Sequence, residues 1–454
     1  MKAESKYKAS IKLSAIGDAL GWITEFEKDA NSIKRKYNIE TVDNFLEWEK
    51  FVGGKFLGYK DKMLPGSYSD DTQLMLATAR CINNDGSINN ERFAKMELAN
   101  WLLYSRGGGK TVKTAAEKIK RKSVKWHNNF FTYKNKDGLT DYRDSGANGA
   151  AMRILPITLA NFSNFENTKE QIFSNSIITH GHPRAIIGAL LYGYAIEKIL
   201  YLNQDNFNPD NYIIEIGKEL KSILELSFLA KAPYEKWINQ WNKGRVKMFL
   251  EVYVDVVEEC LELLRIVYKG IKNETNDKEL LNQLGCFSKD TKGSGIATVI
   301  SGIFLATKYY KTPKDAIISA VNLIGSDTDS IAAFAGGLLG ALYGQGIIPD
   351  KWKNVQDIEY LDKVAENLLA ISEDRVLENR SNNFININNF KNLDTFGFTE
   401  FKDKDYVFFE PLGNGMIEHI EERKTLTNNK FVLLSNVKFD IGQTCVFHKL
   451  ITRN

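Results

Sequence analysis

Apolar residues recur at spacings of three and four along most of residues 1–375, which is the pattern of helices that bury one face. Segments that alternate polar and apolar residues, as half-buried strands do, are few before about residue 380. Two long polar connections, Lys50–Ser69 and Asn128–Gly146, interrupt the pattern, and loops of such length in a compact domain are often functional. The pattern predicts a mainly helical fold, with helices over Asn90–Tyr104, Pro183–Leu202, Tyr212–Ala230, Met248–Ile271 and Asp357–Ile371.

The chain changes character after Arg380, where the Asn-rich segment Ser381–Asn392 is typical of a linker or an irregular entry segment. Two short polar motifs, Gly413-Asn414-Gly415 and Asn428-Asn429, are predicted to be turns. The runs of β-branched and aromatic residues around them predict strands over Tyr406–Phe409, Met416–Ile420, Phe431–Leu434 and Thr444–Ile451. We therefore expect a small β-rich C-terminal domain of unknown role over residues 382–454, after a helical domain over residues 1–375.

The composition is that of a folded protein. The 454 residues are 43% hydrophobic and 26% charged, with eight prolines, and the small net charge of +3 argues neither for nor against a nucleic-acid partner. The polar N-terminus lacks the apolar stretch of a secretory signal, and no window reaches the roughly 18 uncharged apolar residues of a membrane span. The scattered cysteines predict neither a disulfide framework nor a zinc ribbon, so we expect a cytoplasmic protein without membrane contact. They are Cys81, Cys260, Cys286 and Cys445.

The candidate chemistry begins at Gly17-Asp18-Ala19-Leu20-Gly21 and Glu25. Asp18 and Glu25 are seven residues apart, about two helical turns, so both carboxylates are predicted to face one side of a helix. A solvated acidic face is the ordinary explanation of such a pair. The flanking small residues favour a functional role, because they let another backbone or a ligand approach closely.

The motif Ser69-Asp70-Asp71-Thr72 precedes an apolar run and has two interpretations. Ser69 is a good N-cap, and two acids in a first turn suit the helix dipole. A purely structural role would therefore account for the whole motif. However, four consecutive oxygen-bearing side chains also supply the hard ligands that Mg²⁺ or Mn²⁺ requires. The motif alone favours neither interpretation.

A second motif, Gly325-Ser326-Asp327-Thr328-Asp329-Ser330, repeats this arrangement before an apolar helix predicted over Ile331–Tyr343. The chain therefore has two separate helix starts, each with paired carboxylates and hydroxyls. If the fold brought them together, the four aspartates would repel each other strongly unless cations lay between them. The two motifs together therefore support a two-metal site more strongly than either motif does alone.

A glycine-rich segment could hold a phosphorylated ligand. Arg106-Gly107-Gly108-Gly109-Lys110-Thr111 precedes a helix predicted to start near Val112, and its backbone N–H groups could cradle a pyrophosphate with Lys110 adding charge. A P-loop is excluded, because Tyr104 stands where that pattern requires glycine. An ordinary glycine-rich turn is the alternative.

Two further motifs carry side chains that could contact a ligand. The small residues around Asn148 and Gly149 suit a close-packed helix start beside a ligand, with a simple turn as the alternative. His180 and His182 are two of only five histidines. Zinc is one reading of that pair, but no nearby cysteine supports it, so we favour hydrogen bonds to a ligand or to a metal-bound carboxylate.

Together these motifs resemble the ADP-ribosylglycohydrolase family, in whose order they occur over about residues 10–345. The resemblance implies a compact all-helical fold with two Mg²⁺ ions, or Mn²⁺, at its cleft. It places a mobile glutamate at Glu25 and a phosphate loop at Gly107–Gly109, and it does not extend past about Glu373. Ala147 and Ser330 depart from the residues of many members, glycine and threonine, without removing an oxygen ligand. The implied metal ligands are Ser69, Asp70, Asp71, Asp327, Asp329 and Ser330.

The implied activity is hydrolysis of the N- or O-glycosidic bond between ADP-ribose and a modified protein or small molecule. Such cleavage passes through an oxocarbenium-like state, and two metal ions about 3.5–4 Å apart can orient the ribose and activate a water. The catalytic proton is expected to be handled by Glu25, Asp70 or Asp329, with acid and base unassigned. The expected substrate contacts are Asp18, Gly107, Gly108, Gly109, Asn148, Gly149, His180 and His182.

Two other classes of function stay open. One is a binding module that recognises ADP-ribose without cleaving it, although the intact ligand set argues against this. The other is an enzyme that removes ADP-ribose from nucleic acid, for which a basic stretch could contact phosphate. A solvated helix face is the favoured explanation of that stretch, which comprises Lys118, Lys120, Arg121, Lys122 and Lys125.

Overall fold

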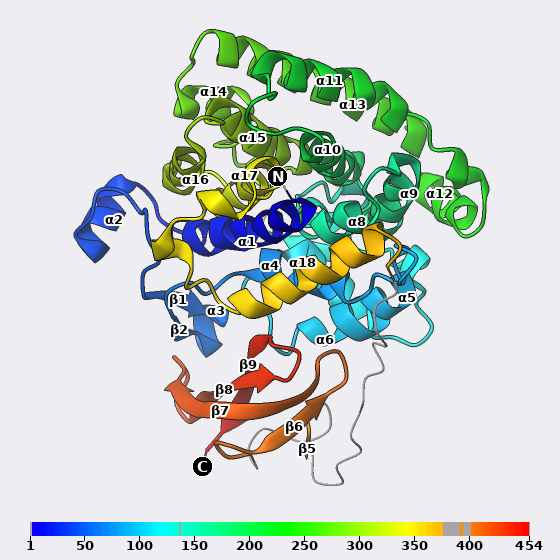
Figure 1. Cartoon of the computed structure of the whole chain (residues 1–454). Helices are drawn as coiled ribbons and strands as arrows, with labels where there is room; N and C mark the ends of the chain where they lie inside the picture. Colours follow the sequence, from blue (N-terminus) through cyan, green and yellow to red (C-terminus); the bar gives the residue numbers. More distant parts are fainter. Residues whose placement is uncertain (1, 136–137, 376–390, 394–400, 454) are drawn as a thin grey trace.

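The computed structural model describes residues 2–135, 138–375, 391–393 and 401–453, which form a helical body with a β-sheet at one end (Figure 1). The first helices are α1 (Ala3–Gly21), α2 (Ala30–Tyr37), α3 (Gly54–Leu57), α4 (Asp70–Ala79), α5 (Asn90–Arg92), α6 (Ala99–Trp101), α7 (Lys110–Ile119), α8 (Leu155–Ala160), α9 (Phe165–Ser176) and α10 (Pro183–Leu200). They are followed by α11 (Pro209–Ile223), α12 (Tyr234–Asn242), α13 (Phe249–Lys272), α14 (Asp277–Gln283), α15 (Gly295–Lys308), α16 (Pro313–Asn322), α17 (Thr328–Tyr343) and α18 (Ile358–Ser372). The strands are β1 (Trp48–Val52), β2 (Tyr59–Met63), β3 (Thr132–Asn135), β4 (Gly138–Asp141), β5 (Lys391–Asn392), β6 (Tyr406–Phe409), β7 (Gly413–Lys424), β8 (Lys430–Phe439) and β9 (Thr444–Thr452).

The helices α1 and α17 form an antiparallel pair at the centre of the body (Figure 1). Glycines allow their backbones to touch: a Cβ on Gly17 would lie 2.3 Å from the carbonyl oxygen of Ala332, and one on Gly340 would lie 2.4 Å from that of Ala9. Gly17 therefore serves contact with another backbone rather than with a ligand. The pairing sets the end of α1 beside the start of α17, where the second aspartate motif lies.

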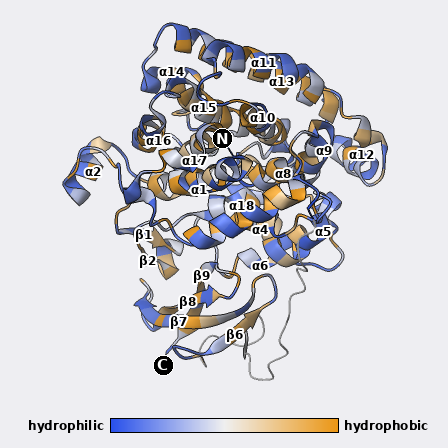
Figure 2. Ribbon diagram, viewed as in Figure 1, coloured by the Kyte–Doolittle hydropathy of each residue, from blue (hydrophilic) through white to orange (hydrophobic). Residues whose placement is uncertain are grey.

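Apolar helices surround this pair, and amphipathic helices cover them. The inner helices α15 and α17 are buried along almost their whole length, whereas the outer helices α11 and α13 mix hydrophilic and hydrophobic residues (Figure 2). In α13 the buried residues, from Phe249 to Val267, recur mainly at spacings of three and four, and α13 confirms the helix predicted over Met248–Ile271. None of the described helices is both long and apolar enough to cross a bilayer.

Two of the predicted helices differ from the structure. The helix expected over Asn90–Tyr104 contains a π-helical turn at Phe93–Leu98 and ends at Trp101. The helix expected over Tyr212–Ala230 ends at Ile223. The apolar residues Phe228 and Leu229, which extended the predicted helix, are buried from a separate 3₁₀ turn instead. Boundaries are the least certain part of such predictions, since local spacing does not report where a chain turns.

The two long polar connections contain β-hairpins, which the sequence pattern did not predict. β1 pairs antiparallel with β2, and β3 pairs antiparallel with β4. The body is therefore mainly but not purely helical, and the expectation of an all-helical domain needs this correction. In β2 the alternation exists, with Tyr59, Asp61 and Met63 buried and Lys60 and Lys62 exposed, but the buried aspartate obscures it.

The C-terminal sheet has the strand order β5-β6-β7-β8-β9, antiparallel except for β5 and β6. All four predicted strands are present, and the turn at Asn428-Asn429 is confirmed. The turn predicted at Gly413-Asn414-Gly415 was wrong: the chain turns at residues 410–412, and Gly413, at φ +79°, begins β7. Most of Ser381–Asn392 lies outside the described residues.

The sheet shares the hydrophobic core of the helical body. The rings of Phe409 and Phe447 lie 6.0 and 5.7 Å from that of Tyr104, between ring centroids. Asp357, which precedes α18, accepts hydrogen bonds at 2.8 Å from the Tyr68 hydroxyl and from the backbone N–H of Thr444. Apolar packing and buried polar contacts therefore both hold the sheet against the body.

Candidate active site

A cavity of about 650 Å³ lies where the end of α1, the starts of α4 and α17, the β1–β2 hairpin and the glycine-rich loop before α7 meet. It collects motifs that lie far apart in the sequence. Most of the predicted site residues line it. These are Glu25, Asp70, Asp71, Gly107, Gly108, Gly109, Asn148, Gly149, His180, Asp327, Asp329 and Ser330.

The start of α4 projects two aspartates into this cavity. Ser69 is the N-cap, as predicted, and its hydroxyl accepts the backbone N–H of Asp71 at 3.2 Å. Asp70 and Asp71 are the first residues of the helix and line the cavity. Ser69 and Asp18 do not line it, because both are fully buried behind the helix start.

The start of α17 supplies the opposing carboxylates. Ser330 donates its hydroxyl hydrogen to the Asp71 carboxylate at 2.7 Å, which links the two helix starts directly. The side-chain amide of Asn148 donates to Asp327 at 2.9 Å. Carboxylate oxygens of Glu25, Asp327 and Asp329 all lie within 4.8 Å of one another. The two aspartate motifs and Glu25 therefore do converge.

Burial and mutual repulsion make this carboxylate cluster hard to ionise. Burial, and then the nearby charge of Asp329, raise the pKa of Asp70 to about 6. The same two causes raise the pKa values of Glu25, Asp71 and Asp327 well above their ordinary range. A hard divalent cation favours ionised oxygen ligands, so this donor set fits such an ion.

The glycine-rich loop lies against the aspartates. The backbone N–H of Gly108 donates to the Asp70 carboxylate at 2.6 Å. Gly107 and Gly108 have φ values of +106° and +84°, a conformation that favours glycine. Lys110, expected to add charge here, lies with its Nζ 3.5 Å from the Lys134 carbonyl oxygen and does not line the cavity.

The two histidines of the predicted pair have different positions. His180 lines the cavity and is fully buried, its Nδ1 is 2.8 Å from the Thr179 hydroxyl, and burial lowers its pKa to about 3. Its Nε2 has no hydrogen-bond partner among the described residues. His182 lies outside this cavity and caps α10 by accepting the backbone N–H of Arg184 at 3.1 Å.

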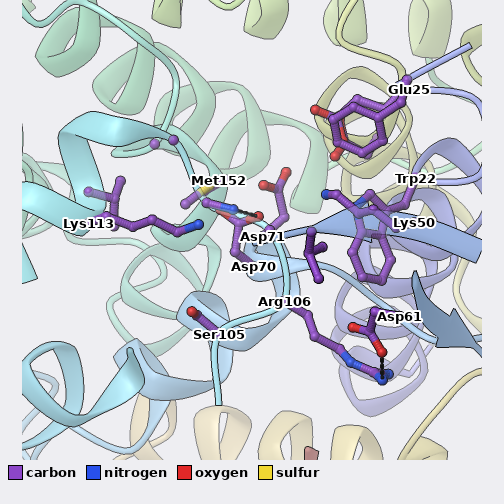
Figure 3. A pocket seen from close by; sticks show the side chains of 18 of the residues that line it. Trp22, Glu25, Lys50, Asp61, Asp70, Asp71, Ser105, Arg106, Lys113 and Met152 are labelled. Atoms are coloured by element: carbon purple, nitrogen blue, oxygen red, sulfur yellow. Dashed lines mark hydrogen bonds and ion pairs between the residues drawn. The ribbon is translucent and has the colours of Figure 1, made fainter. Parts of the chain in front are cut away.

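Several lining residues were not singled out by the sequence motifs. Figure 3 shows Lys50 and Lys113 on opposite sides of Asp70 and Asp71. Lys50 places its Nζ 5.1 Å from the ring centre of Trp22. Lys113 lies one turn into α7, a position that the glycine-rich motif itself could have indicated, whereas Lys50 stands in a connection without a recognisable motif.

The C-terminal sheet also contributes to the cavity wall. Leu434 of β8 and Val446 and His448 of β9 line it, next to Tyr59 of β2. Arg106, which also lines the cavity, forms an ion pair of 3.0 Å with Asp61, drawn as a dashed line in Figure 3. The sequence assigned no function to this part of the chain, because a pattern of strands does not report which helices they pack against.

The basic stretch considered for nucleic acid lies outside this cavity. Lys118 and Arg121, at the end of α7, line a separate cavity beside Phe130 and Arg143. None of the five basic residues of the stretch lines the cavity that holds the carboxylates. The charges of the stretch therefore do not face the candidate site.

Known proteins match most of this chain. The sequence model of the ADP-ribosylglycohydrolase family matches residues 1–378. The chain belongs to the ADP-ribosylglycohydrolase family. Membership supports an ADP-ribosyl hydrolase activity, and the acidic cluster is a possible metal site. The C-terminal sheet lies beyond the matched residues.

Individual relatives show how far the similarity extends. The ADP-ribosyl-[dinitrogen reductase] glycohydrolase of Rhodospirillum rubrum is 25% identical over 359 residues, covering 79% of this chain and 92% of the relative. ADP-ribosylhydrolase ARH3 of Danio rerio is 26% identical, covering 80% and 90%. ADP-ribosylarginine hydrolase Tri1 of Serratia proteamaculans is 22% identical, covering 81% and 80%. A solved structure described as an ADP-ribosylglycohydrolase-related protein complex aligns with a TM-score of 0.48 and 17% identity, over 82% of this chain and 99% of its own.

Proposed function

We propose that this protein hydrolyses the N- or O-glycosidic bond between ADP-ribose and a modified protein or small molecule, with two divalent cations, Mg²⁺ or Mn²⁺, at the carboxylate cluster. The observation that carries the proposal is the convergence of Glu25, two aspartates of α4 and two of α17 on one cavity. Five carboxylates in one cavity, two of them buried and three half-buried, repel one another at a cost that cations between them would offset.

The residues that would hold the ions are Asp70, Asp71, Asp327 and Asp329. When bound, the ions would orient the ribose hydroxyls and lower the pKa of a water. The Ser330 hydroxyl oxygen, near the start of α17, is a further candidate ligand for the ions. In the structure this hydroxyl donates a hydrogen bond to the Asp71 carboxylate at 2.7 Å. Ser69 is farther from the cavity, so its proposed contribution is to fix the start of α4.

Glu25 is the group that we propose for proton transfer. It follows α1 in a turn, and its carboxylate has no hydrogen bond or ion pair to another described residue. By contrast, Asp70, Asp71 and Asp327 each accept a hydrogen bond at 2.6–2.9 Å. A carboxylate free of such contacts can move between the acceptor oxygen or nitrogen and a water, as general acid–base catalysis requires.

Other parts of the cavity would hold the ADP-ribose. The glycine-rich loop lines the cavity beside Asp70, which accepts the N–H of Gly108, and it precedes α7; this arrangement suits a pyrophosphate, with Lys113 supplying charge. Burial keeps the His180 ring neutral, and its free Nε2 can exchange a hydrogen bond with a sugar or base atom. Gly149 leaves room for that ring, since a Cβ there would lie 2.8 Å from His180 Cε1.

The test is release of ADP-ribose, measured by chromatography, from differently linked ADP-ribosyl substrates with Mg²⁺ or Mn²⁺. We expect the wild type to cleave one linkage class and to stop when the cations are chelated. Asp329→Asn is expected to lose about 10²-fold or more in kcat while remaining folded. Asp350→Asn, at an exposed ion pair, is the control and should keep full activity. Wild-type turnover in Asp329→Asn would refute the assignment of the site.

A further inference from the structure

The C-terminal sheet lies outside the residues that the family shares, yet it forms part of the cavity wall. The family match ends at residue 378, whereas Leu434, Val446 and His448 line the same cavity as the carboxylates. The residues that the family has in common, among them the carboxylates and the glycine-rich loop, therefore all precede the sheet.

The wall residues are held in one orientation by strand pairing. Leu434 and His448 are directly opposite each other in the β8–β9 ladder, and Val446 lies two residues before His448, so the three side chains face the same side. On that side Leu434 packs with Val432 and with Tyr59 of β2. The opposite side carries Phe447, which faces the core.

Backbone contacts place this wall beside the glycine-rich loop. The N–H of His448 donates to the carbonyl of Leu103 at 3.3 Å, shortly before the loop begins. The N–H of Leu426 donates to the carbonyl of Gly58 at 3.0 Å, next to β2. The sheet is therefore tied to both neighbours of the cavity, the loop and the β1–β2 hairpin, and its side chains keep a fixed position relative to the carboxylates.

The charged side chains that line the cavity differ in whether they have a partner. Among the described lining residues, four aspartates belong to the proposed metal site, Glu25 is the proposed proton-transfer group, and the sixth carboxylate, Asp61, is paired with Arg106. Lys50 and Lys113 remain as unpaired cations, with no ion pair to a described residue. With Lys113 assigned to the pyrophosphate and every lining carboxylate already given a role, a cationic acceptor such as a guanidinium would meet the charge of Lys50, which is unfavourable.

We propose that Leu434, Val446 and His448, together with Tyr59, form the acceptor-side wall of the cleft and select acceptors that are uncharged or anionic and present an apolar surface. The proposal rests on the proposed function of the carboxylate cluster. It assigns the wall to the acceptor rather than to ADP-ribose, because ADP-ribose is the part of the substrate common to the family, and the family match ends before the sheet.

The experiment compares two matched peptides, one ADP-ribosylated on serine and one on arginine, and measures kcat/KM in Mg²⁺. We expect the wild type to prefer the serine-linked peptide. His448→Ala is expected to lower kcat/KM for that peptide by about tenfold, the size of one lost contact in a specificity pocket. Affinity for free ADP-ribose, measured by calorimetry, should stay unchanged. His419→Ala is the matched control, because this histidine lies exposed on β7 of the same sheet, away from the cavity.

A second variant tests the charge argument by supplying the missing carboxylate. Val446→Asp should shift the preference toward the arginine-linked peptide, and His448 remains as an independent probe if this variant folds poorly. Equal losses for both peptides together with weaker ADP-ribose binding would assign the wall to ADP-ribose and overturn the proposal, as would no change in either variant. A wild type that prefers the arginine-linked peptide would also overturn it. A wild type that cleaves neither peptide nor any other ADP-ribosyl substrate would instead remove the proposed function on which this inference rests.

Discussion

Asp18 and Thr72 are joined by two hydrogen bonds: the Asp18 carboxylate accepts the Thr72 hydroxyl at 2.6 Å and its backbone N–H at 3.0 Å. The same carboxylate accepts the N–H of Ser69 at 3.1 Å. A side chain of α1 therefore caps the start of α4, where Asp70 and Asp71 project into the cavity. We propose that Asp18 positions these aspartates, in place of the substrate contact expected from the sequence.

Removing this cap is expected to affect both stability and the site. Asp18→Ala leaves buried donors of Ser69 and Thr72 without an acceptor, so we expect the free energy of unfolding to fall by about 1–3 kcal/mol. Metal affinity and kcat should fall with it, and Asp18→Asn, which keeps one acceptor oxygen, should restore part of both. Denaturant unfolding, metal calorimetry and ADP-ribose release measure these effects. Loss of activity with unchanged metal affinity would argue against a positioning role.

Two neighbouring glycines give a matched pair of variants. A Cβ on Gly107 would lie 2.2 Å from Asp70 Oδ1, and the φ of +106° is unfavourable for alanine, whereas a Cβ on Gly109 meets nothing within 4 Å. Gly107→Ala should displace the Asp70 carboxylate and lower kcat/KM by about 10²-fold, the cost of a displacement near 1 Å. Gly109→Ala leaves Asp70 undisturbed, so it should keep the wild-type affinity for Mg²⁺, whereas Gly107→Ala should lose part of it. Equal Mg²⁺ affinities in the two variants, measured by calorimetry, would contradict the placement of Asp70.

The sequence predicted the helical class and the C-terminal strands, because these depend on local patterns, whereas the convergence of the two aspartate motifs was expected from the family resemblance. Helix starts at Asp70 and Thr328 carry a cap or paired acids, which can be recognised without knowing the fold. The pairing of α1 with α17 was not predictable in detail, although small residues such as Gly17 signalled close packing. Repulsion between the motifs indicated only that cations would lie between them once the fold brought them together.

The parts that could not be predicted depend on long-range packing. Lys50 and Tyr59 reach the cavity from a hairpin whose alternation is obscured by a buried, ion-paired aspartate, Asp61. His448 reaches it only because the sheet packs beside the glycine-rich loop. His182 illustrates the opposite case, in which proximity to His180 in sequence did not place both side chains in one cavity. Side-chain type and spacing do not encode such contacts.

The stability of the metal-free protein should depend on pH with a definite sign. Burial and then the charge of Asp329 raise the pKa of Asp18 from 3.8 to about 7 and that of Asp70 from 3.8 to about 6. Between pH 3.8 and about pH 6 to 7, the folded state binds more protons than the unfolded state. The free energy of unfolding therefore falls as pH rises through this range. The contribution of these groups is fully present below pH 3.8 and is lost as pH rises through about 6 to 7.

Urea unfolding in a chelator should therefore show lower stability at about pH 8 than at about pH 5. Added Mg²⁺ should stabilise the protein more at the higher pH, because the ion binds the ionised carboxylates. Asp70→Asn removes one of the shifted groups and should flatten the dependence in the chelator. Stability that rises with pH in this range would show that the carboxylates are not buried together as the structure has them.

The last prediction concerns Asp357, which joins the C-terminal sheet to the helical body. Its carboxylate accepts the Tyr68 hydroxyl and the N–H and hydroxyl of Thr444, each at 2.8 Å, and it lies 3.1 Å from Lys438 Nζ. Asp357→Asn keeps the left-handed backbone conformation, which asparagine tolerates, but loses the charge and one acceptor oxygen.

We expect Asp357→Asn to lower the free energy of unfolding by about 1–3 kcal/mol, because buried donors lose a charged acceptor. Hydrogen exchange should show β8 and β9 losing protection while α1 and α17 keep theirs, since the sheet is attached at the edge of the core. If the wall of the cleft depends on this attachment, the variant should also lower the preference between acceptors while free ADP-ribose binds as before. Asp403→Asn, which removes an exposed contact to the backbone N–H of Ile420 within the same sheet, is the control. Equal loss of protection across the sheet and the central helices would mean that the two unfold as one unit and that Asp357 does not act as a local attachment.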